Sequence, residues 1–246
     1  MNTKTIHLTE TSSTNEWLRT YKPQDDKEMT IVSTDFQTTG HGQGTNTWES
    51  GRGQNLLFSI MVHPRHLPVG KQFLLSEAAA NAFREALCKY LPEEEVTVKW
   101  PNDIYYKDQK ISGTLIETSI SSKGMGRAVI GTGINVNQKV FASDAPNPVS
   151  LCQILGHDID RNELMEHIIE AFSRQYDMLD QGLYADISSQ YHSTLYRKTG
   201  FHRYQDSEGE FEGALIEVED DGHLILHDRQ GLVRSYAFKE IKFLKD

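Results

Sequence analysis

A lysine at the start of an apolar strand, close to a glycine, is the most informative feature of the sequence. In the stretch KWPNDIYYKDQKISG, residues 99–113, Lys110 precedes Ile111 and lies three residues before Gly113. A glycine within a strand lets a ligand approach the backbone closely, and a lysine ammonium is a compact positive charge. The pattern predicts an anion-binding site at Lys110.

The corner Trp100-Pro101-Asn102-Asp103, before this strand, limits how the chain can run. Pro101 cannot donate a ladder hydrogen bond and disfavours helix at Trp100, so the predicted strand 96–100 ends there. Asn102 and Asp103 can turn the chain and bond to backbone or ligand groups. The alternative is an ordinary Asn-capped turn, with Trp100 in the core and the lysines on either side at the surface.

Residues 12–17, SSTNEW, have the pattern of a helix start. The order Ser13 to Glu16 predicts a capping box, in which the Ser13 hydroxyl caps the helix and Glu16 reaches back. This structural role explains the pattern by itself. The functional alternative is that the free N–H groups and hydroxyls of the helix start cradle a polar ligand group.

A long connection, QTTGHGQGTNTWESGRGQN at residues 37–55, joins two strong strand patterns and contains five glycines. Connections of this length inside a compact domain are commonly functional. Gly-x-Gly-x-Gly resembles a dinucleotide fingerprint, but no helix pattern follows it. We predict that a protease cuts this connection in the free protein and that a bound ligand protects it, because ligand contacts offset the entropy of the open loop. Inert surface is the alternative.

The stretch IGTGINVN, residues 130–137, reads either as a bulged strand that ends in an Asn turn or as a strand that points Asn135 into a cleft. The histidine pairs 63/66 and 223/227 come without a clear third ligand, so no structural metal site is expected.

Composition narrows the class of protein. The formal net charge is −10 over 246 residues, with charges of both signs mixed along the chain. Nucleic-acid and membrane-surface proteins usually carry a clustered basic face, so neither partner is expected. The two cysteines form no CxxC, and no apolar stretch resembles a signal core or a membrane span. We expect a cytoplasmic protein with reduced thiols.

Strand-like and helix-like segments alternate up to about residue 182. Strands are predicted at 30–36, 55–63, 96–100, 110–118 and 128–136, helices at 71–91 and 161–181, and a polar loop at 141–150. From residue 196 onward, short strands and turns predict a small antiparallel barrel, too small to be independently stable. The predicted domains are residues 1–195 and 196–246.

The order of motifs along the chain resembles that of the biotin–protein ligases. From the N-terminus these motifs are STN, the GxGxxxxxW connection, KWPNDIYxxxxKxxGxLIE, GxGINVN and the C-terminal barrel. The resemblance covers nearly the whole chain, and KWPND with Lys110 and Gly113 is its most specific element. It implies an α+β fold, in which a mixed sheet flanked by helices, similar to class II synthetases, is followed by an SH3-like β-barrel. The implied reaction joins biotin and ATP into biotinyl-5′-adenylate and then transfers biotin to a lysine of a biotin carboxyl carrier protein.

The resemblance also assigns roles to residues. Lys110 resembles the family lysine that bridges the biotin carboxylate and the α-phosphate. The residues implied to bind biotin are Ser13, Thr14, Asn15, Gln37, Gly40, His41, Gly42, Gln43, Lys110 and Gly113. Those implied to bind ATP or the adenylate are Trp48, Asn102, Lys110 and Asn135. Mg²⁺ would accompany the ATP phosphates near Asn102.

One part of the chain departs from the family pattern. Typical members carry arginine after the first glycine of the connection and another basic residue two positions on, where this chain has His41 and Gln43. The connection therefore contributes less positive charge, and we expect Lys110 to carry more of the phosphate compensation. The adenylate should be held less tightly than in arginine-bearing relatives.

Several alternatives stay open at this point. A lipoate or octanoyl–protein ligase shares the fold, although KWPNDIY favours biotin, and a non-catalytic biotin- or adenylate-binding module is a different class. A DNA-binding repressor is disfavoured, because the chain is acidic and begins just before the ligase domain, without a winged helix-turn-helix. The sequence does not specify the oligomeric state, and a homodimer is one option.

Overall fold

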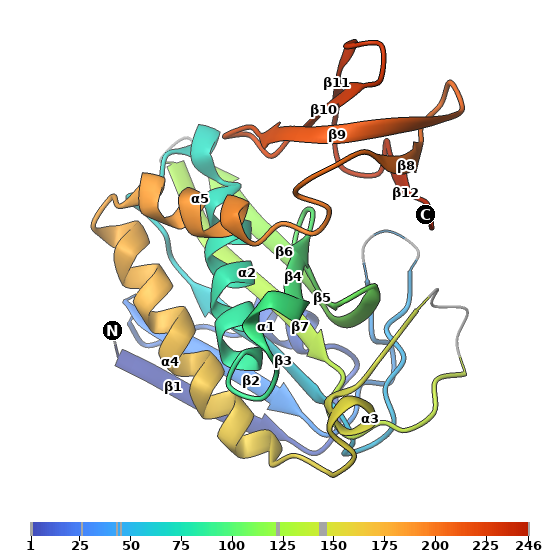
Figure 1. Cartoon of the computed structure of the whole chain (residues 1–246). Coiled ribbons are helices and arrows are strands. Elements are labelled where there is room, and N and C mark those ends of the chain that lie inside the picture. The colour runs from blue at the N-terminus through green and yellow to red at the C-terminus, as the bar shows by residue number, and fades with distance from the viewer. Residues whose placement is uncertain are drawn as a thin grey trace.

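The computed structural model describes residues 2–25, 27–42, 44, 46–121, 124–142 and 147–245. A seven-stranded mixed sheet with helices on both faces forms the larger part, and C-terminal residues form a second, antiparallel sheet beside it (Figure 1). The predicted α+β class is confirmed.

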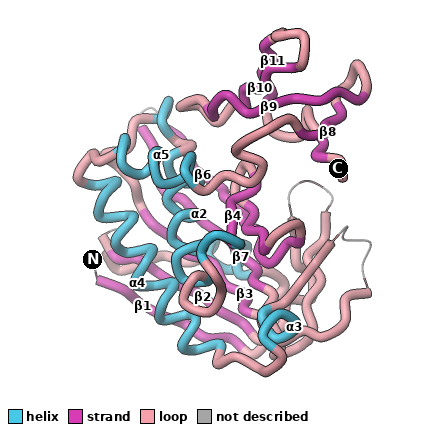
Figure 2. The backbone as a smooth tube through the Cα atoms, in the orientation of Figure 1, coloured by secondary structure: helices cyan, strands magenta, loops and turns pink. Residues whose placement is uncertain are grey.

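The larger sheet contains β1 (Asn2–Leu8), β2 (Glu28–Thr34), β3 (Leu56–Val62), β4 (Val96–Lys99), β5 (Asp103–Tyr106), β6 (Gln109–Ser121) and β7 (Gly124–Ile134). Their order across the sheet is β1-β2-β3-β7-β6-β5-β4, with β1 and β2 parallel and all other neighbours antiparallel. Figure 2 shows the strands of this sheet in magenta, beside the cyan helices that pack on it. The five strands predicted before residue 137 are confirmed as β2, β3, β4, β6 and β7. Two further strands, β1 and β5, had too few apolar residues in alternation to be predicted.

The helices are α1 (Thr14–Thr20), α2 (Leu74–Leu87), α3 (Leu151–Leu155), α4 (Arg161–Asp180) and α5 (Tyr184–Ser193). The predicted helices 71–91 and 161–181 are confirmed as α2 and α4. The first is shorter than predicted, because Val69–Lys71 forms a separate 3₁₀ turn and the α-helix begins at Leu74.

β3 shows how the two faces of the sheet are used, since all seven of its residues are buried. Phe58 and Ile60 point into the large core under α2 and α4, whereas Met61 packs in a smaller cluster under α1. Successive side chains of a strand alternate between faces, so Ser59 lies on the α1 face with Met61. The α1 face is therefore the one that presents polar side chains inside the fold.

The second sheet contains β8 (His202–Gln205), β9 (Glu210–Val218), β10 (Leu224–Asp228), β11 (Val233–Tyr236) and β12 (Lys242–Phe243), in the order β11-β10-β9-β8-β12. Within the described part of the chain its two edge strands, β11 and β12, are not paired with each other. This arrangement is compatible with an SH3-like barrel.

The turn before β10 holds the second sheet against the first. The Trp100 indole Nε1 donates to the Gly222 carbonyl at 2.9 Å, and Lys71 pairs with Asp220 at 2.6 Å. A Cβ built on Gly222 would lie 2.5 Å from the Phe73 ring, so only glycine allows this close packing. The core under α2 and α4 is continuous with the buried apolar residues of the second sheet.

None of the described helices is both long enough and apolar enough to cross a lipid bilayer.

Candidate active site

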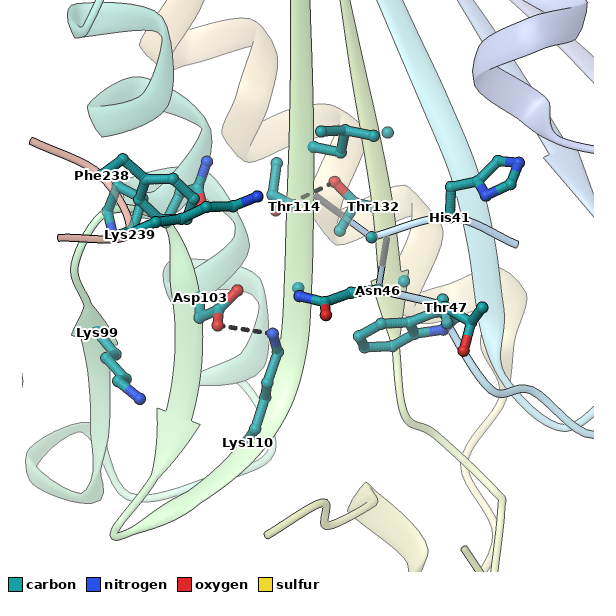
Figure 3. Close-up of a pocket in the computed structure, with 18 of the residues that line it drawn as sticks. His41, Asn46, Thr47, Lys99, Asp103, Lys110, Thr114, Thr132, Phe238 and Lys239 are labelled. Carbon is teal, nitrogen blue, oxygen red and sulfur yellow. Dashed lines mark hydrogen bonds and ion pairs between the residues drawn. The ribbon is translucent and has the colours of Figure 1, made fainter. Parts of the chain in front are cut away.

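A pocket of about 710 Å³ opens between the α1 face of the larger sheet and the segment that leads into β12. Its walls come from α1, the connection at residues 37–55 (the Gly-rich connection), β5, β6, β7 and residues 238–244 (Figure 3). Ten of the predicted site residues line it: Ser13, Thr14, Asn15, Gln37, His41, Gly42, Trp48, Asn102, Lys110 and Gly113.

Lys110 lies on β6 with its side chain in the pocket, as predicted, and not at the open surface. Its Nζ donates to Asp103 Oδ2 on the neighbouring strand β5 at 2.6 Å (Figure 3). The two side chains are 31% and 26% exposed, so the pair is partly removed from water and still accessible to a ligand. Low local polarity strengthens its electrostatic interactions compared with those of an exposed pair.

Two glycines that face each other across β6 and β7 form the floor of the pocket. Gly113 lies opposite Gly133 in the strand register, and the Trp48 ring covers both. A Cβ built on Gly113 would lie 2.8 Å from this ring, and a Cβ on Gly133 would overlap it. The space that the glycines leave is therefore occupied by the indole here, where the sequence had predicted a ligand against Gly113.

The Trp48 indole brings an unsatisfied polar atom to the same place. Its Nε1 is buried and has no hydrogen-bond partner among the described residues. Buried donors are normally paired, so this N–H is a candidate for a ligand acceptor.

The start of α1 is held by a network of short hydrogen bonds. The Thr14 backbone N–H donates to Gln37 Oε1 at 2.8 Å, and the Thr14 hydroxyl donates to the same atom at 3.1 Å. Ser59 Oγ lies 2.6 Å from both Thr14 Oγ1 and Asn15 Oδ1, and Asn15 Nδ2 donates to Glu117 at 3.0 Å. The network fixes the orientation of these side chains. Ser59 is buried in a strand and carried no signal in the sequence.

The predicted capping box at this helix is wrong. Ser13 is the N-cap residue, but its side chain makes no capping hydrogen bond, and Glu16 instead accepts from the Ser12 hydroxyl at 2.8 Å. Ser13 instead lies among the residues that line the pocket. A true capping box starts α3, between Ser150 and Gln153.

The Gly-rich connection folds back on itself over the pocket. Trp48 N–H donates to the Gly40 carbonyl at 3.0 Å, and Gly42 N–H donates to the Asn46 carbonyl at 2.7 Å. His41 lines the pocket with its Nε2 4.0 Å from a Glu16 oxygen.

Two predicted residues that the structure describes, Gly40 and Asn135, do not line the pocket. Gly40 supports it from behind through the backbone pairing with Trp48. Asn135 is buried beyond the end of β7 with its Oδ1 unpaired among the described residues. Gln43 lies outside the described residues, as do residues 143–146 of the predicted polar loop, so the predictions made for them stay predictions.

The pocket contains more positive charge than the sequence predicted. Besides Lys110 it is lined by Lys99, Lys239 and Lys242, and Asp103 is the single carboxylate among its described lining residues. Lys110 therefore shares the positive charge of the pocket with three other lysines. Four lysines thus gather at one pocket in a chain whose net charge is −10, and this local positive charge favours an anionic ligand there.

Lys99, the first residue of the KWPND motif, is partly buried in the pocket wall. Its Nζ lies 2.9 Å from the Tyr105 hydroxyl and 4.9 Å from the centre of the Phe243 ring of the second sheet. Burial lowers the pKa of Lys99 from 10.5 to about 8; nearby Asp103 opposes this shift, and Lys110 adds to it.

This shift predicts a pH-dependent effect on stability. Below about pH 8 both the folded and the unfolded chain keep the Lys99 proton, so the folded state bears the full free-energy cost of burying the charged ammonium. Between about 8 and 10.5 the unfolded chain holds more protons at this position, and the cost falls as pH rises. We expect Lys99→Met to stabilise the protein most below pH 8, with a gain over wild type that shrinks across this window. Urea unfolding of both proteins over the pH range measures it, and a constant difference would contradict the assignment.

The fold is that of biotin protein ligases. The structure is similar to "Biotin protein ligase from Aquifex aeolicus in complex with biotin and ATP", with a TM-score of 0.80, 24% identity and 99% coverage of each chain. At that identity the likeness shows the fold alone.

Residues 8–135 match the family model of the biotin/lipoate A/B protein ligase family, and the chain belongs to this family. The resemblance inferred from the sequence motifs is thereby confirmed. The chain is 30% identical over 216 residues to the bifunctional ligase/repressor BirA of Bacillus subtilis, covering 85% of this chain and 65% of that protein. It is 29% identical over 209 residues to the biotin--[acetyl-CoA-carboxylase] ligase of Paracoccus denitrificans, covering 79% of this chain and 82% of that protein. The chain thus spans 65% of the length of its Bacillus relative.

Proposed function

We propose that the protein activates biotin with ATP to biotinyl-5′-adenylate and transfers the biotinyl group to a lysine of a biotin carboxyl carrier protein. The observation that carries this proposal is the placement of Lys110. It is a half-buried lysine on β6, beside the glycine floor of a cationic pocket, in a chain of the biotin/lipoate ligase family. The names of the relatives and structural neighbours support biotin over lipoate as the carboxylic acid that is activated.

The first step needs two anions to meet. The biotin carboxylate oxygen attacks the α-phosphorus of ATP, a P–O bond forms, and pyrophosphate leaves with the electron pair of the broken bond. The ammonium of Lys110 would bridge the carboxylate and the α-phosphate and so offset their repulsion. The side chains fixed around Thr14 and Gln37 would hold the uncharged ring of biotin, and the Trp48 indole would pack beside the adenylate.

Mg²⁺ fits this pocket as a companion of ATP. It prefers oxygen ligands and is commonly held by one or two carboxylates together with substrate phosphates. The Asp103 carboxylate and the Asn102 side-chain carbonyl both line the pocket and could hold it. The ion would neutralise phosphate charge when bound.

In the second step the acceptor lysine of the carrier attacks the carbonyl carbon of the mixed anhydride as a free amine. An amide bond forms, AMP leaves, and the amine loses its proton. We place the boundary between the ligase domain and the C-terminal sheet at residues 195 and 196. Support comes from α5, which ends the first part at Ser193, and from β8, which starts the second sheet at His202.

The test is to incubate the protein with biotin, ATP, Mg²⁺ and a biotin carboxyl carrier protein. We expect a carrier mass increase by one biotinyl group that requires ATP and is not reproduced when lipoate or octanoate replaces biotin. Modification with lipoate or octanoate in place of biotin would point to the related lipoyl or octanoyl reaction. Biotin binding without any change in carrier mass would identify a non-catalytic binding module.

A further inference from the structure

The pocket rim contributed by the C-terminal sheet carries a lysine in an unusual backbone conformation. Lys239 lies between β11 and β12 with φ at 76°, in the left-handed region that favours glycine. A side chain at such a position is retained against a conformational cost, and strained residues of this kind cluster at ligand sites.

The Lys239 side chain extends into the pocket. It approaches the Gly-rich connection so closely that a Cβ built on Gly44 would lie 2.5 Å from its Nζ. Gly44 itself has φ at 68°, so the connection has no side chain at the point where Lys239 arrives. Figure 3 shows Lys239 entering from the C-terminal ribbon on the same side of the pocket as Asp103. Lys239 thus lies at the pocket where the C-terminal sheet and the Gly-rich connection, two segments far apart in sequence, come together.

The charges around the pocket leave this ammonium available for a ligand. Lys110 is paired with Asp103, and Lys99 donates to Tyr105. Within the described part of the chain, no ion pair or hydrogen bond occupies Lys239 Nζ. The one arginine in residues 37–55, Arg52, pairs with Glu10 and does not line the pocket.

We propose that Lys239 binds the phosphates of ATP and supplies, from the C-terminal sheet, positive charge that the Gly-rich connection does not carry. The inference rests on the proposed ATP-dependent activation. It favours a polyphosphate over an acidic carrier surface, because Lys239 lines the same pocket as Lys110 and a triphosphate concentrates several negative charges there.

The test uses Lys239→Gly, which removes the ammonium and also relieves the backbone conformation. We expect the Kd for ATP, measured by calorimetry, to rise about tenfold or more, since a charge-assisted contact is lost. Biotin affinity should change less than about twofold and the melting temperature should not fall, because glycine suits this φ. Lys239→Arg should retain ATP affinity within about threefold.

Lys107→Gly is the matched control. Lys107 is also a lysine with positive φ, at 52°, but it pairs with Glu95 and does not line the pocket. Its replacement should leave ATP affinity unchanged.

The outcomes separate this inference from the proposed function. An unchanged ATP affinity in Lys239→Gly, in a protein that biotinylates the carrier, overturns the inference and leaves the function standing. A loss confined to carrier transfer, with normal ATP binding and pyrophosphate release, also overturns it and points to carrier docking. Weakened ATP binding in a protein that shows no biotinylation supports the inference and contradicts the function. A wild-type protein that does not bind ATP contradicts both.

Discussion

Lys110→Ala is expected to lower the rate of biotinyl-adenylate formation by about 10²–10³ while the protein stays folded, the usual effect of removing one preorganised charge-stabilising group. A unit charge about 4 Å from an anion contributes about 4 kcal/mol at an effective dielectric near 20. The Lys110 side chain is 31% exposed and its Nζ donates to Asp103 Oδ2 at 2.6 Å, so its ammonium is held in place before the substrates arrive. Biotin-dependent pyrophosphate release measures the effect, and circular dichroism checks the fold.

Two further variants make this prediction specific. Lys107→Ala removes a lysine from the neighbouring turn, outside the pocket, and should keep wild-type activity. The double variant Lys110→Ala/Asp103→Asn tests whether the loss arises merely because the Asp103 carboxylate is left without its 2.6 Å partner. Activity restored in the double variant, or near-normal pyrophosphate release in a folded Lys110→Ala protein, would remove Lys110 from the mechanism.

Phe83→Ala is expected to produce the largest loss of stability, about 3–5 kcal/mol of unfolding free energy. Phe83 is fully buried on α2. Its ring meets Phe58 of β3 edge to face at 5.7 Å and stacks on Phe172 of α4 at 6.3 Å, so one side chain joins the helix layer to the sheet. Alanine would leave a cavity where these three elements meet.

Urea unfolding measures this loss, and Ile216→Ala is the control. Ile216 lies on β9 and is 47% exposed, so its truncation should change stability by less than about 1 kcal/mol. A similar small change in Phe83→Ala would mean that the helix layer does not depend on this aromatic contact.

The strands and the long helices of the larger sheet could be predicted because their signals are local. β3, with seven buried residues, and the helix 161–180 have apolar patterns that specify their structure without reference to the rest of the chain. β1 could not be predicted in this way: it is a mostly polar edge strand, and its pairing with β2, more than twenty residues on, makes it a strand. The capping box predicted at Ser13 is also absent: Glu16 accepts from Ser12, and Ser13 lies on a pocket that segments distant in the sequence complete, which a local pattern does not report.

The sequence by itself determined the family, most of the larger sheet and the place of Lys110, because these depend on motifs and periodicities within short stretches of chain. Only the tertiary structure decided which further charges face the ligand. Lys99 and Lys239 line one pocket although 140 positions separate them, and Trp48 covers two glycines on strands β6 and β7. A sequence pattern reports local backbone preference and burial, whereas the approach of side chains from separate elements depends on how the two sheets pack together.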